Sequence, residues 1–260
     1  MGSTLSVITI CYNNLDELTS TCSSVDKQTQ LPNEHLIIDG SANKDIINWL
    51  ASSTQPAYRK WIHETDKGIA DAFNKGIKNS TGDIIHLLNS GDTYTNGDSL
   101  KTVLNHFNED SSLMWSHSMY LQQRGKIEVN SGLPFEKEQL WKGMRQVAHP
   151  TMFLRKEVYE QHGYFDDQLK IAMDYDLLVR IRNEKNIFIE KTLVRFAPGG
   201  VSDQQFYKGL KEVKNSYQKH IGPSKQQNMW QLRQKLLHIF MQTGIGKIWF
   251  SIKNRKNRIR

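Results

Sequence analysis

The sequence has few cysteines and no long hydrophobic run. Its 260 residues include only two cysteines, Cys11 and Cys22, which cannot form a disulfide framework and favour a reducing cytoplasm. No uninterrupted apolar segment reaches the roughly 20 residues of a membrane-spanning helix. No charged segment followed by an apolar one precedes Leu5, so we expect no secretion signal. Hydrophobic residues make up 38% of the chain, which is enough to bury a full core.

Acidic residues are missing from the last part of the chain. Residues 225–260 hold nine Lys or Arg and no Asp or Glu, whereas residues 1–224 hold 25 basic and 27 acidic residues. A protein that binds nucleic acid would more often spread basic groups over its body, so we expect no nucleic-acid partner. We predict a folded body over 1–224 and a basic helical tail over 225–260.

Apolar residues recur at helical spacing in this tail. One stripe consists of Met229, Leu232, Leu236, Ile239 and Phe240, and a second of Ile245, Ile248, Trp249 and Ile252. With the basic residues, this pattern is typical of amphipathic helices on an anionic membrane surface, with Trp230 and Trp249 at headgroup depth. The protein would then be cytoplasmic and peripheral on the inner face of the cell membrane. The alternative is a helical pair that packs on the body or forms a homodimer, because apolar stripes usually mark buried contacts.

Short apolar runs alternate with helical patterns in the first hundred residues. We expect strands over 5–10, 35–39, 61–63 and 84–88, and helices over about 15–25, 44–52 and 68–79. This alternation predicts an α/β fold with a doubly wound, mainly parallel sheet and right-handed crossovers. The second half is irregular, with strands expected over 113–116 and 126–129 and helices over 158–161, 175–184 and 204–220.

The run ending in Asn89-Ser90-Gly91-Asp92 is the most informative of these strands. In open α/β sheets, ligands bind just beyond the carboxyl ends of the strands. An acid at that place, next to a glycine that lets backbone approach closely, suggests a metal ion and a phosphate group. The alternative is a strand followed by an ordinary polar turn.

Five motifs in this order resemble family 2 of the glycosyltransferases. They are Thr9-Ile10-Cys11-Tyr12-Asn13, Ile38-Asp39-Gly40-Ser41, the segment from Asp66 to Gly76, Leu88-Asn89-Ser90-Gly91-Asp92 and Met173-Asp174-Tyr175-Asp176. The resemblance covers about residues 5–202. It implies the GT-A fold: a Rossmann-like nucleotide-sugar-binding part over about 5–100, an irregular acceptor-binding part over about 101–224, and here a C-terminal helical extension. It also implies an inverting transferase that moves a hexose or N-acetylhexosamine from a UDP-sugar.

The resemblance implies a donor-nucleotide site at the ends of the strands. Asp39 would accept a hydrogen bond from the uracil ring, and a helix beginning near Gly68 would favour the diphosphate. The implied donor-binding residues are Thr9, Cys11, Tyr12, Asn13, Asp39, Lys67, Gly68, Asp71, Asn74, Ser90 and Gly91. The alternatives are a turn residue for Asp39 and an ordinary solvated helix face for Asp71 and its neighbours.

The metal site implied by the resemblance has only one acid in this sequence. Members of the family commonly carry an Asp-any-Asp pattern, whereas here Ser90 precedes Gly91 and Asp92. Asp92, helped by diphosphate oxygens and water, could still hold Mg²⁺ or Mn²⁺. The ion would stabilise the negative charge that grows on the leaving diphosphate.

Asp174 occupies the position of the catalytic carboxylate in the family. It would act as the general base on the acceptor hydroxyl, although Met173 replaces the usual preceding Glu. Asp176 would point elsewhere and either cap the helix or pair with Arg180. The alternative for Asp174 is an N-cap of the helix that begins at Tyr175.

Three further residues would lie on the acceptor or diphosphate side: His149, Met173 and Gly200. A lone His such as His149 is more often structural than functional. Gly200 belongs to the segment Pro198 to Ser202, which could be a loop that closes over the donor or a simple turn between elements.

A polyprenyl-diphosphate-linked saccharide is the acceptor that a membrane-attached enzyme of this family would meet, in the assembly of a surface polysaccharide such as O-antigen or capsule. A nucleotidyltransferase is a second hypothesis, but the segment from Cys11 to Asn14 lacks the glycine and basic residue that it would need. An inactive scaffold that only binds nucleotide sugars is a third, favoured by the loss of acids at Ser90 and Met173.

Overall fold

A computed structural model of the chain describes residues 2–124, 127–197, 205–244 and 246. In the first half, strands and helices alternate. The elements are β1 (Leu5–Cys11), α1 (Leu15–Asp26), β2 (Glu34–Asp39), α2 (Asp45–Ser52), β3 (Arg59–His63), α3 (Ile69–Asn79), β4 (Ile84–Leu87), β5 (Thr93–Tyr94) and α4 (Ser99–Glu109).

The second half contains longer strands and the helices that cover them. Its elements are β6 (Trp115–Arg124), β7 (Ile127–Ser131), the 3₁₀ helices η1 (Lys137–Lys142) and η2 (His149–Thr151), β8 (Phe153–Arg155), α5 (Lys156–His162), α6 (Met173–Arg180), β9 (Asn186–Phe196), α8 (Phe206–His220) and α9 (Lys225–Gln242).

All described strands belong to one sheet, in the order β3, β2, β1, β4, β8, β6, β9 and β5, with β7 paired to β6. The first four of these strands are parallel, and β6 and β9 are parallel to each other. Antiparallel pairing in the described part is confined to β5, β7 and β8. The expected α/β fold with a mainly parallel sheet is therefore confirmed.

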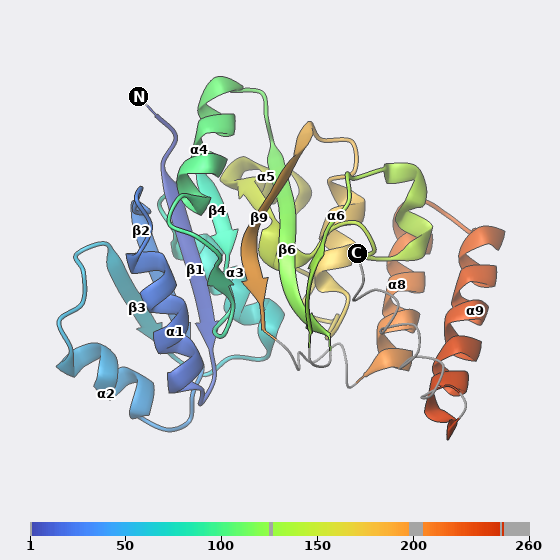
Figure 1. Cartoon of the computed structure of the whole chain (residues 1–260), viewed down its shortest axis with the longest axis horizontal. Helices are drawn as coiled ribbons and strands as arrows, with labels where there is room; N and C mark the ends of the chain where they lie inside the picture. Colours follow the sequence, from blue (N-terminus) through green and yellow to red (C-terminus); the bar gives the residue numbers. More distant parts are fainter. Residues whose placement is uncertain (1, 125–126, 198–204, 245, 247–260) are drawn as a thin grey trace.

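Helices cover both faces of this sheet (Figure 1). Side chains of α3 and α6 share one apolar cluster with β1, β2 and β4, and side chains of α1, α2 and α4 fill two clusters on the other face. The helix α3 lies very close to β1, because a Cβ placed on Gly76 would lie 2.4 Å from a methyl carbon of Ile8. Gly76 is therefore required for this close packing.

Two long elements, one in each half of the fold, were not expected from the sequence. The helix α4 buries Leu100, Val103, Leu104 and Phe107 at the spacing of an amphipathic helix, so its pattern was present but overlooked. The long strand β9 was also missed, because the register of β6 against β9 shifts twice near Met119 and no simple alternation results. The predicted second stripe of the tail lies outside the described residues.

The last two described helices, α8 and α9, stand beside each other at the far end of the molecule (Figure 1). The helix α9 contacts the body through Trp230, whose ring lies 5.8 Å from that of Trp141 and whose Nε1 donates to the carbonyl of Lys142. Trp230, which the sequence pattern placed at headgroup depth, is thus half-buried against the body. Within the described ranges, none of the helices combines the length and apolar character needed to cross a bilayer.

Candidate functional site

Polar residues gather at the edge of the sheet where the parallel strands end, at the bottom of Figure 1. The strand β1 ends at Cys11, β2 at Asp39 and β3 at His63, and these three residues are direct neighbours in the sheet register. The turn from residue 89 to 92 follows β4 at the same edge. The topology thus brings most of the predicted donor-site residues to one place.

Asp39 is fully buried at this edge and pairs with His63. Its Oδ2 lies 2.7 Å from Nδ1 of His63, and its Oδ1 accepts a 3.0 Å bond from the backbone N–H of Ser41. The side chain of His63 is 32% exposed, whereas that of Asp39 is 0% exposed. His63 is therefore the member of the pair that a ligand can reach. The thiol of Cys11 lies 3.8 Å from Oδ1 of Asp39, and burial raises the pKa of that thiol.

The loop after β1 is held by local hydrogen bonds. Asn13 adopts a positive φ of 54°, and its backbone N–H donates to Oγ of Ser41 over 2.8 Å. Tyr12 is 64% exposed beside it. Thr9, in contrast, is buried inside the sheet, and its hydroxyl lies 3.0 Å from Nε2 of His35. Of the residues predicted to frame a base, Tyr12 is thus the most accessible.

The loop before α3 is tied together by Lys75. Its Nζ lies 2.9 Å from Oδ1 of Asp66, 3.0 Å from Glu64 and 3.5 Å from Oδ2 of Asp71. Desolvation alone would lower the pKa of Lys75, but the hydrogen bonds to Asp66 and Glu64 outweigh it and raise that pKa. Asp71 also accepts a 3.0 Å bond from the backbone N–H of Lys67, which lowers the pKa of its carboxyl. The start of α3 is consequently rigid, with the side chain of Lys67 exposed.

Asn74 joins α3 to the acceptor half. Its amide donates to the carbonyl of Phe165 over 2.9 Å and accepts from the N–H of Phe165 over 3.0 Å. These two hydrogen bonds hold the backbone at Phe165 against α3. The ring of His149 lies 5.0 Å from that of Phe73 and 5.9 Å from that of Phe165, and desolvation lowers the pKa of His149 to about 4. The imidazole is therefore neutral near pH 7 and offers one hydrogen-bond donor and one acceptor rather than a positive charge.

Asp92 closes a tight turn after β4. Gly91 has a positive φ of 98°, and Thr21 of α1 holds the turn: its hydroxyl accepts from the N–H of Gly91 over 2.9 Å and donates to the carbonyl of Asp92 over 2.8 Å. Oδ1 of Asp92 accepts a 2.8 Å bond from the backbone N–H of Ala197. Burial raises the pKa of Asp92 to about 7.

Three buried oxygen atoms in this turn have no hydrogen-bond partner in the described part of the chain. They are Oδ1 of Asn89, Oγ of Ser90 and Oδ2 of Asp92. Oxygen atoms are the ligands that Mg²⁺ and Mn²⁺ prefer, so these residues fit such an ion together with a diphosphate. No cluster of three or more His, Cys, Asp or Glu side chains suited to a metal is found in the described ranges. Asp92 is therefore the single acid that this turn offers.

Asp174 lies in the first turn of α6. Its Oδ1 accepts a 2.7 Å bond from the backbone N–H of Tyr175. Burial raises the pKa of Asp174 to about 6, while the bond to Tyr175 acts in the opposite direction. The segment before α6 lies beside the start of α3, because a Cβ placed on Gly68 would lie 3.8 Å from Nζ of Lys170. Met173 is buried and contributes to the apolar cluster on that face.

The helix α8 holds α6 at two points. The carboxylate of Glu212 accepts bonds from the backbone N–H groups of Ile171 and Ala172 over 2.8 and 2.9 Å. Nε2 of His220 lies 2.9 Å from Oδ1 of Asp176, whose Oδ2 pairs with Nε of Arg180 over 2.9 Å. The expected pairing of Asp176 with Arg180 is confirmed. Contacts with α8 therefore fix the helix that carries Asp174.

Gly200 lies outside the described residues, as does the segment 198–202 predicted to close over the donor. Ala197 is the last described residue before this segment, and its backbone N–H donates a hydrogen bond to Oδ1 of Asp92.

Three residues that contact the site were missed in the sequence: Thr21, His63 and Glu212. His63 could have been found, because it ends a strand next to Asp39 in a parallel sheet. Thr21 and Glu212 lie on helices, where a single polar residue is usually a solvated one. Their contacts depend on the packing of helices that the sequence pattern does not specify.

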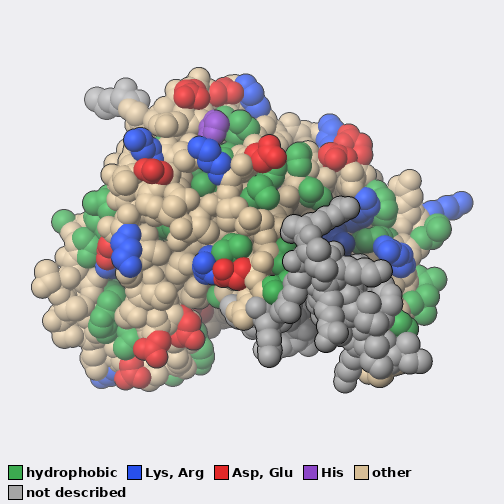
Figure 2. Space-filling model, in the orientation of Figure 1, with side chains coloured by type: hydrophobic (Ala, Val, Ile, Leu, Met, Phe, Trp, Pro, Cys, Tyr) green, Lys and Arg blue, Asp and Glu red, His purple; other side chains and the backbone are tan. Residues whose placement is uncertain are grey.

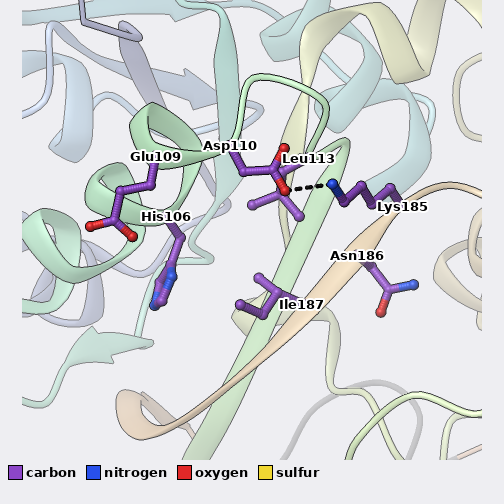
Figure 3. Close-up of a pocket in the computed structure, with 7 residues that line it drawn as sticks. All are labelled: His106, Glu109, Asp110, Leu113, Lys185, Asn186 and Ile187. Atoms are coloured by element: carbon purple, nitrogen blue, oxygen red, sulfur yellow. Dashed lines mark ion pairs between the residues drawn. The ribbon is translucent and has the colours of Figure 1, made fainter.

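A separate cavity of about 270 Å³ lies elsewhere in the molecule (Figure 3). Its lining residues come from the end of α4 and from the segments where β6 and β9 begin: His106, Glu109, Asp110, Leu113, Lys185, Asn186 and Ile187. Since β6 and β9 begin at the edge where β1 and β4 also begin, this cavity lies opposite the turn with Asp92. An ion pair of 2.7 Å joins Lys185 to Asp110 there. We assign the cavity no part in catalysis.

Two solved structures share this fold with the chain. Residues 1–349 of S. aureus TarS superpose with a TM-score of 0.65 over 88% of this chain and 69% of that fragment, at 17% sequence identity. A mannosyltransferase from Pyrobaculum calidifontis, solved with GDP-Man and Mn²⁺, superposes with a TM-score of 0.64 over 86% of this chain and 66% of its own, at 14% identity. At such identities the likeness shows a common fold, and it confirms the predicted GT-A architecture.

Sequence comparison gives the family. An uncharacterized glycosyltransferase of Mycobacterium tuberculosis is 31% identical over 180 residues, which is 68% of each chain. A PGL/p-HBAD biosynthesis glycosyltransferase of Mycobacterium bovis is 24% identical over 179 residues, or 67% of this chain and 68% of that one. Residues 6–163 match the family model named Glycosyl transferase family 2. The chain therefore belongs to glycosyltransferase family 2.

Proposed function

We propose that the protein is an inverting hexosyl- or N-acetylhexosaminyltransferase that uses a UDP-sugar. Two desolvated acids carry this proposal: Asp92 after β4, which is buried, and Asp174 at the start of α6, which is half-buried. Burial raises the pKa of both acids, to about 7 and about 6. Such values are typical of groups that exchange a proton or bind a cation near neutral pH.

In this proposal Asp174 is the general base. It takes the proton from the acceptor hydroxyl while the oxygen of that hydroxyl attacks the anomeric carbon of the sugar. The bond from this carbon to the diphosphate oxygen breaks on the opposite face, so the configuration inverts and UDP leaves. With a pKa of about 6, Asp174 is mostly ionised at neutral pH and is still a sufficiently strong base to accept the proton.

The turn from residue 89 to 92 would hold the diphosphate end of the donor. Asp92, Asn89 and Ser90 would supply oxygen ligands to Mg²⁺ or Mn²⁺, since each has a buried oxygen without a described partner. The ion, when bound, would stabilise the negative charge of the departing diphosphate. The start of α3 at Gly68 would add the positive end of the helix dipole, and the side chain of Lys67, whose backbone N–H already donates to Asp71, would add a positive charge.

The nucleotide is proposed to be UDP because of the pair formed by Asp39 and His63. The accessible ring of His63, held by the buried carboxylate of Asp39, would provide a hydrogen-bond acceptor for the N3–H of uracil. Among the neighbours in structure, TarS has been solved with UDP-GlcNAc, whereas the mannosyltransferase has been solved with GDP-Man.

The proposed acceptor is a saccharide on a polyprenyl diphosphate, used in the assembly of a surface polysaccharide. Peripheral attachment to the inner face of the cell membrane, predicted from the basic tail, would bring the enzyme to such a substrate.

A screen of nucleotide sugars tests the proposal. UDP- and GDP-sugars are added one at a time with Mn²⁺, and the thermal stability of the protein and the release of free nucleotide are measured. We expect a UDP-hexose or UDP-N-acetylhexosamine to raise the melting temperature and to release UDP in the presence of an acceptor. Binding without any release, with Asp174→Asn behaving like the unmodified enzyme, would instead support an inactive scaffold.

A further inference from the structure

The helix α9 has its polar and apolar faces reversed relative to a helix on a protein core. Its inward face carries Gln227, which is 0% exposed, and Gln231, which is 6% exposed. Its outward face carries four apolar residues at helical spacing, which we call the outer stripe. The outer stripe consists of Met229, Leu232, Leu236 and Ile239, which are 72, 59, 60 and 53% exposed.

This arrangement is costly in water. Gln231 donates one hydrogen bond to the carbonyl of Leu210, but the amide oxygen and nitrogen of the buried Gln227 have no partner in the described ranges. It is unfavourable to bury polar groups without hydrogen bonds and to expose large apolar side chains to water. The arrangement becomes favourable when the outer stripe meets an apolar phase.

The charges around the outer stripe are all of one sign within α9. Lys225, Arg233 and Lys235 lie on the helix, and no acidic residue occurs anywhere from 225 to 260. Arg145 and Arg233 also lie against the ring of Trp230, with their guanidinium carbons 5.4 and 5.1 Å from its centroid. Figure 2 shows hydrophobic and basic side chains beside each other at the end of the molecule formed by α9.

We propose that the outer stripe of α9 is a docking surface for an anionic lipid bilayer. The helix would lie in the plane of the interface, with Leu232 and Leu236 among the acyl chains and the flanking basic residues at the phosphate groups. Its glutamine face remains on the body, so the helix links the catalytic domain to the membrane surface. This inference depends on neither the donor sugar nor the role of Asp174.

A second copy of the chain is the competing occupant of the outer stripe. Two such helices face to face would each bring Lys225, Arg233 and Lys235 without an acid on α9 to neutralise them. Like charges across an interface are unfavourable, whereas an anionic surface attracts every one of them. Charge complementarity therefore favours the bilayer.

Vesicle binding of the full chain tests this proposal. Co-sedimentation is measured with vesicles of phosphatidylcholine alone and with vesicles of equal parts phosphatidylcholine and phosphatidylglycerol. We expect binding to the anionic vesicles that weakens with salt, and a loss of about tenfold or more in the double variant Leu232→Gln/Leu236→Gln. The matched control is Leu31→Gln/Leu133→Gln, which alters two leucines that are 47 and 58% exposed elsewhere; its binding should be unchanged.

A second variant, Lys225→Gln/Lys235→Gln, leaves the stripe intact. It should bind anionic vesicles more weakly and with a smaller dependence on salt, and this test holds even if the leucine variant fails to fold. Equal vesicle binding by the unmodified protein and both α9 variants would overturn the proposal. So would a dimer in light scattering that the leucine variant converts to a monomer, because the stripe would then face a second copy. Donor binding, measured on the same samples, separates these outcomes from a failure of the proposed transferase function.

Discussion

Oδ1 of Asp92 accepts a 2.8 Å hydrogen bond from the backbone N–H of Ala197, and Oδ2 of Asp92 is buried with no described partner. The two oxygens of one carboxylate therefore have different surroundings. A buried negative charge with one free oxygen is unfavourable until a proton or a cation neutralises it. This asymmetry distinguishes Asp92 from an ordinary turn residue and makes it the first residue to test.

Replacing Asp92 by Asn preserves the size of the side chain and an oxygen for the bond to Ala197, but removes the charge. We expect the affinity for UDP in the presence of Mn²⁺ to fall by about tenfold or more, and the affinity without Mn²⁺ to change little. Calorimetric titrations with and without the ion measure both. Asp45→Asn, at an exposed position on α2, is the matched control. Equal affinities with Mn²⁺ for the unmodified enzyme and Asp92→Asn would remove Asp92 from the metal site.

The same substitution should stabilise the metal-free protein at neutral pH. Burial raises the pKa of Asp92 from 3.8 to about 7. The folded state thus binds the proton more tightly than the unfolded state, so the contribution of this acid to stability is full below about pH 4 and is lost as pH rises towards 7. Asp92→Asn should melt several degrees higher than the unmodified protein at pH 8 and at nearly the same temperature at pH 4. A lower melting temperature at pH 8 would contradict this.

The catalytic role of Asp174 is tested by Asp174→Asn. The amide cannot take the proton of the acceptor hydroxyl, so we expect kcat to fall by about a thousandfold or more. Donor binding should stay within a few-fold, because Asp174 lies on α6 and not at the strand ends that hold the nucleotide. Asp167→Asn, a nearby exposed position, serves as the control. Residual turnover within a few-fold of the unmodified enzyme would mean that another group is the base.

The pH dependence of transfer should follow both acids. Burial raises the pKa of Asp174 to about 6 and that of Asp92 to about 7, and both must be ionised for the proposed roles. Activity should therefore rise with pH up to about 7 and fall steeply below about 6. A bound metal ion would lower the pKa of Asp92, because a cation favours the ionised form of its carboxyl. A rate that stays constant between about pH 5 and pH 8 would exclude Asp174 as the base.

The first half of the fold and its site edge could be predicted because the residues there act locally. The β-branched run of β1 and the apolar run of β4 both end in polar residues, and parallel strands place those ends together. The pairing of Asp176 with Arg180 follows from helical spacing alone. In these cases the pattern of nearby residues is enough to predict the interaction.

The features that could not be predicted depend on contacts between segments that are distant in the sequence. Glu212 lies 40 residues after Ala172 on a helix whose exposed face gives no hint of a capping role. The sequence left two orientations of the outer stripe open, outward or onto the body, because the periodicity of α9 indicates two faces but not which of them meets the body. Gln227 and Gln231 decide this by being buried, against the usual preference of their side chains.

Glu212 is expected to be a positioning residue for Asp174. Its carboxylate accepts bonds from the N–H groups of Ile171 and Ala172, and so fixes the start of α6. Glu212→Gln should lower kcat by about tenfold with little change in the KM of the donor, and should shift the acid limb of the pH profile, because the environment of Asp174 changes. Glu160→Gln on α5, which is exposed, is the control. A loss of stability with unchanged kcat and pH profile would show that the role is only structural.

Recognition of the base should depend on His63 as well as on Asp39. Asp39 is fully buried, and a His63 ring that donates through Nδ1 to its carboxylate presents Nε2 as an acceptor for the N3–H of uracil. His63→Phe should therefore weaken UDP binding by about tenfold in calorimetry. His162→Phe is the matched control, since His162 also pairs with a carboxylate, that of Glu184 at 2.8 Å, away from the site. If only Asp39→Asn weakens binding, Asp39 contacts the base without His63.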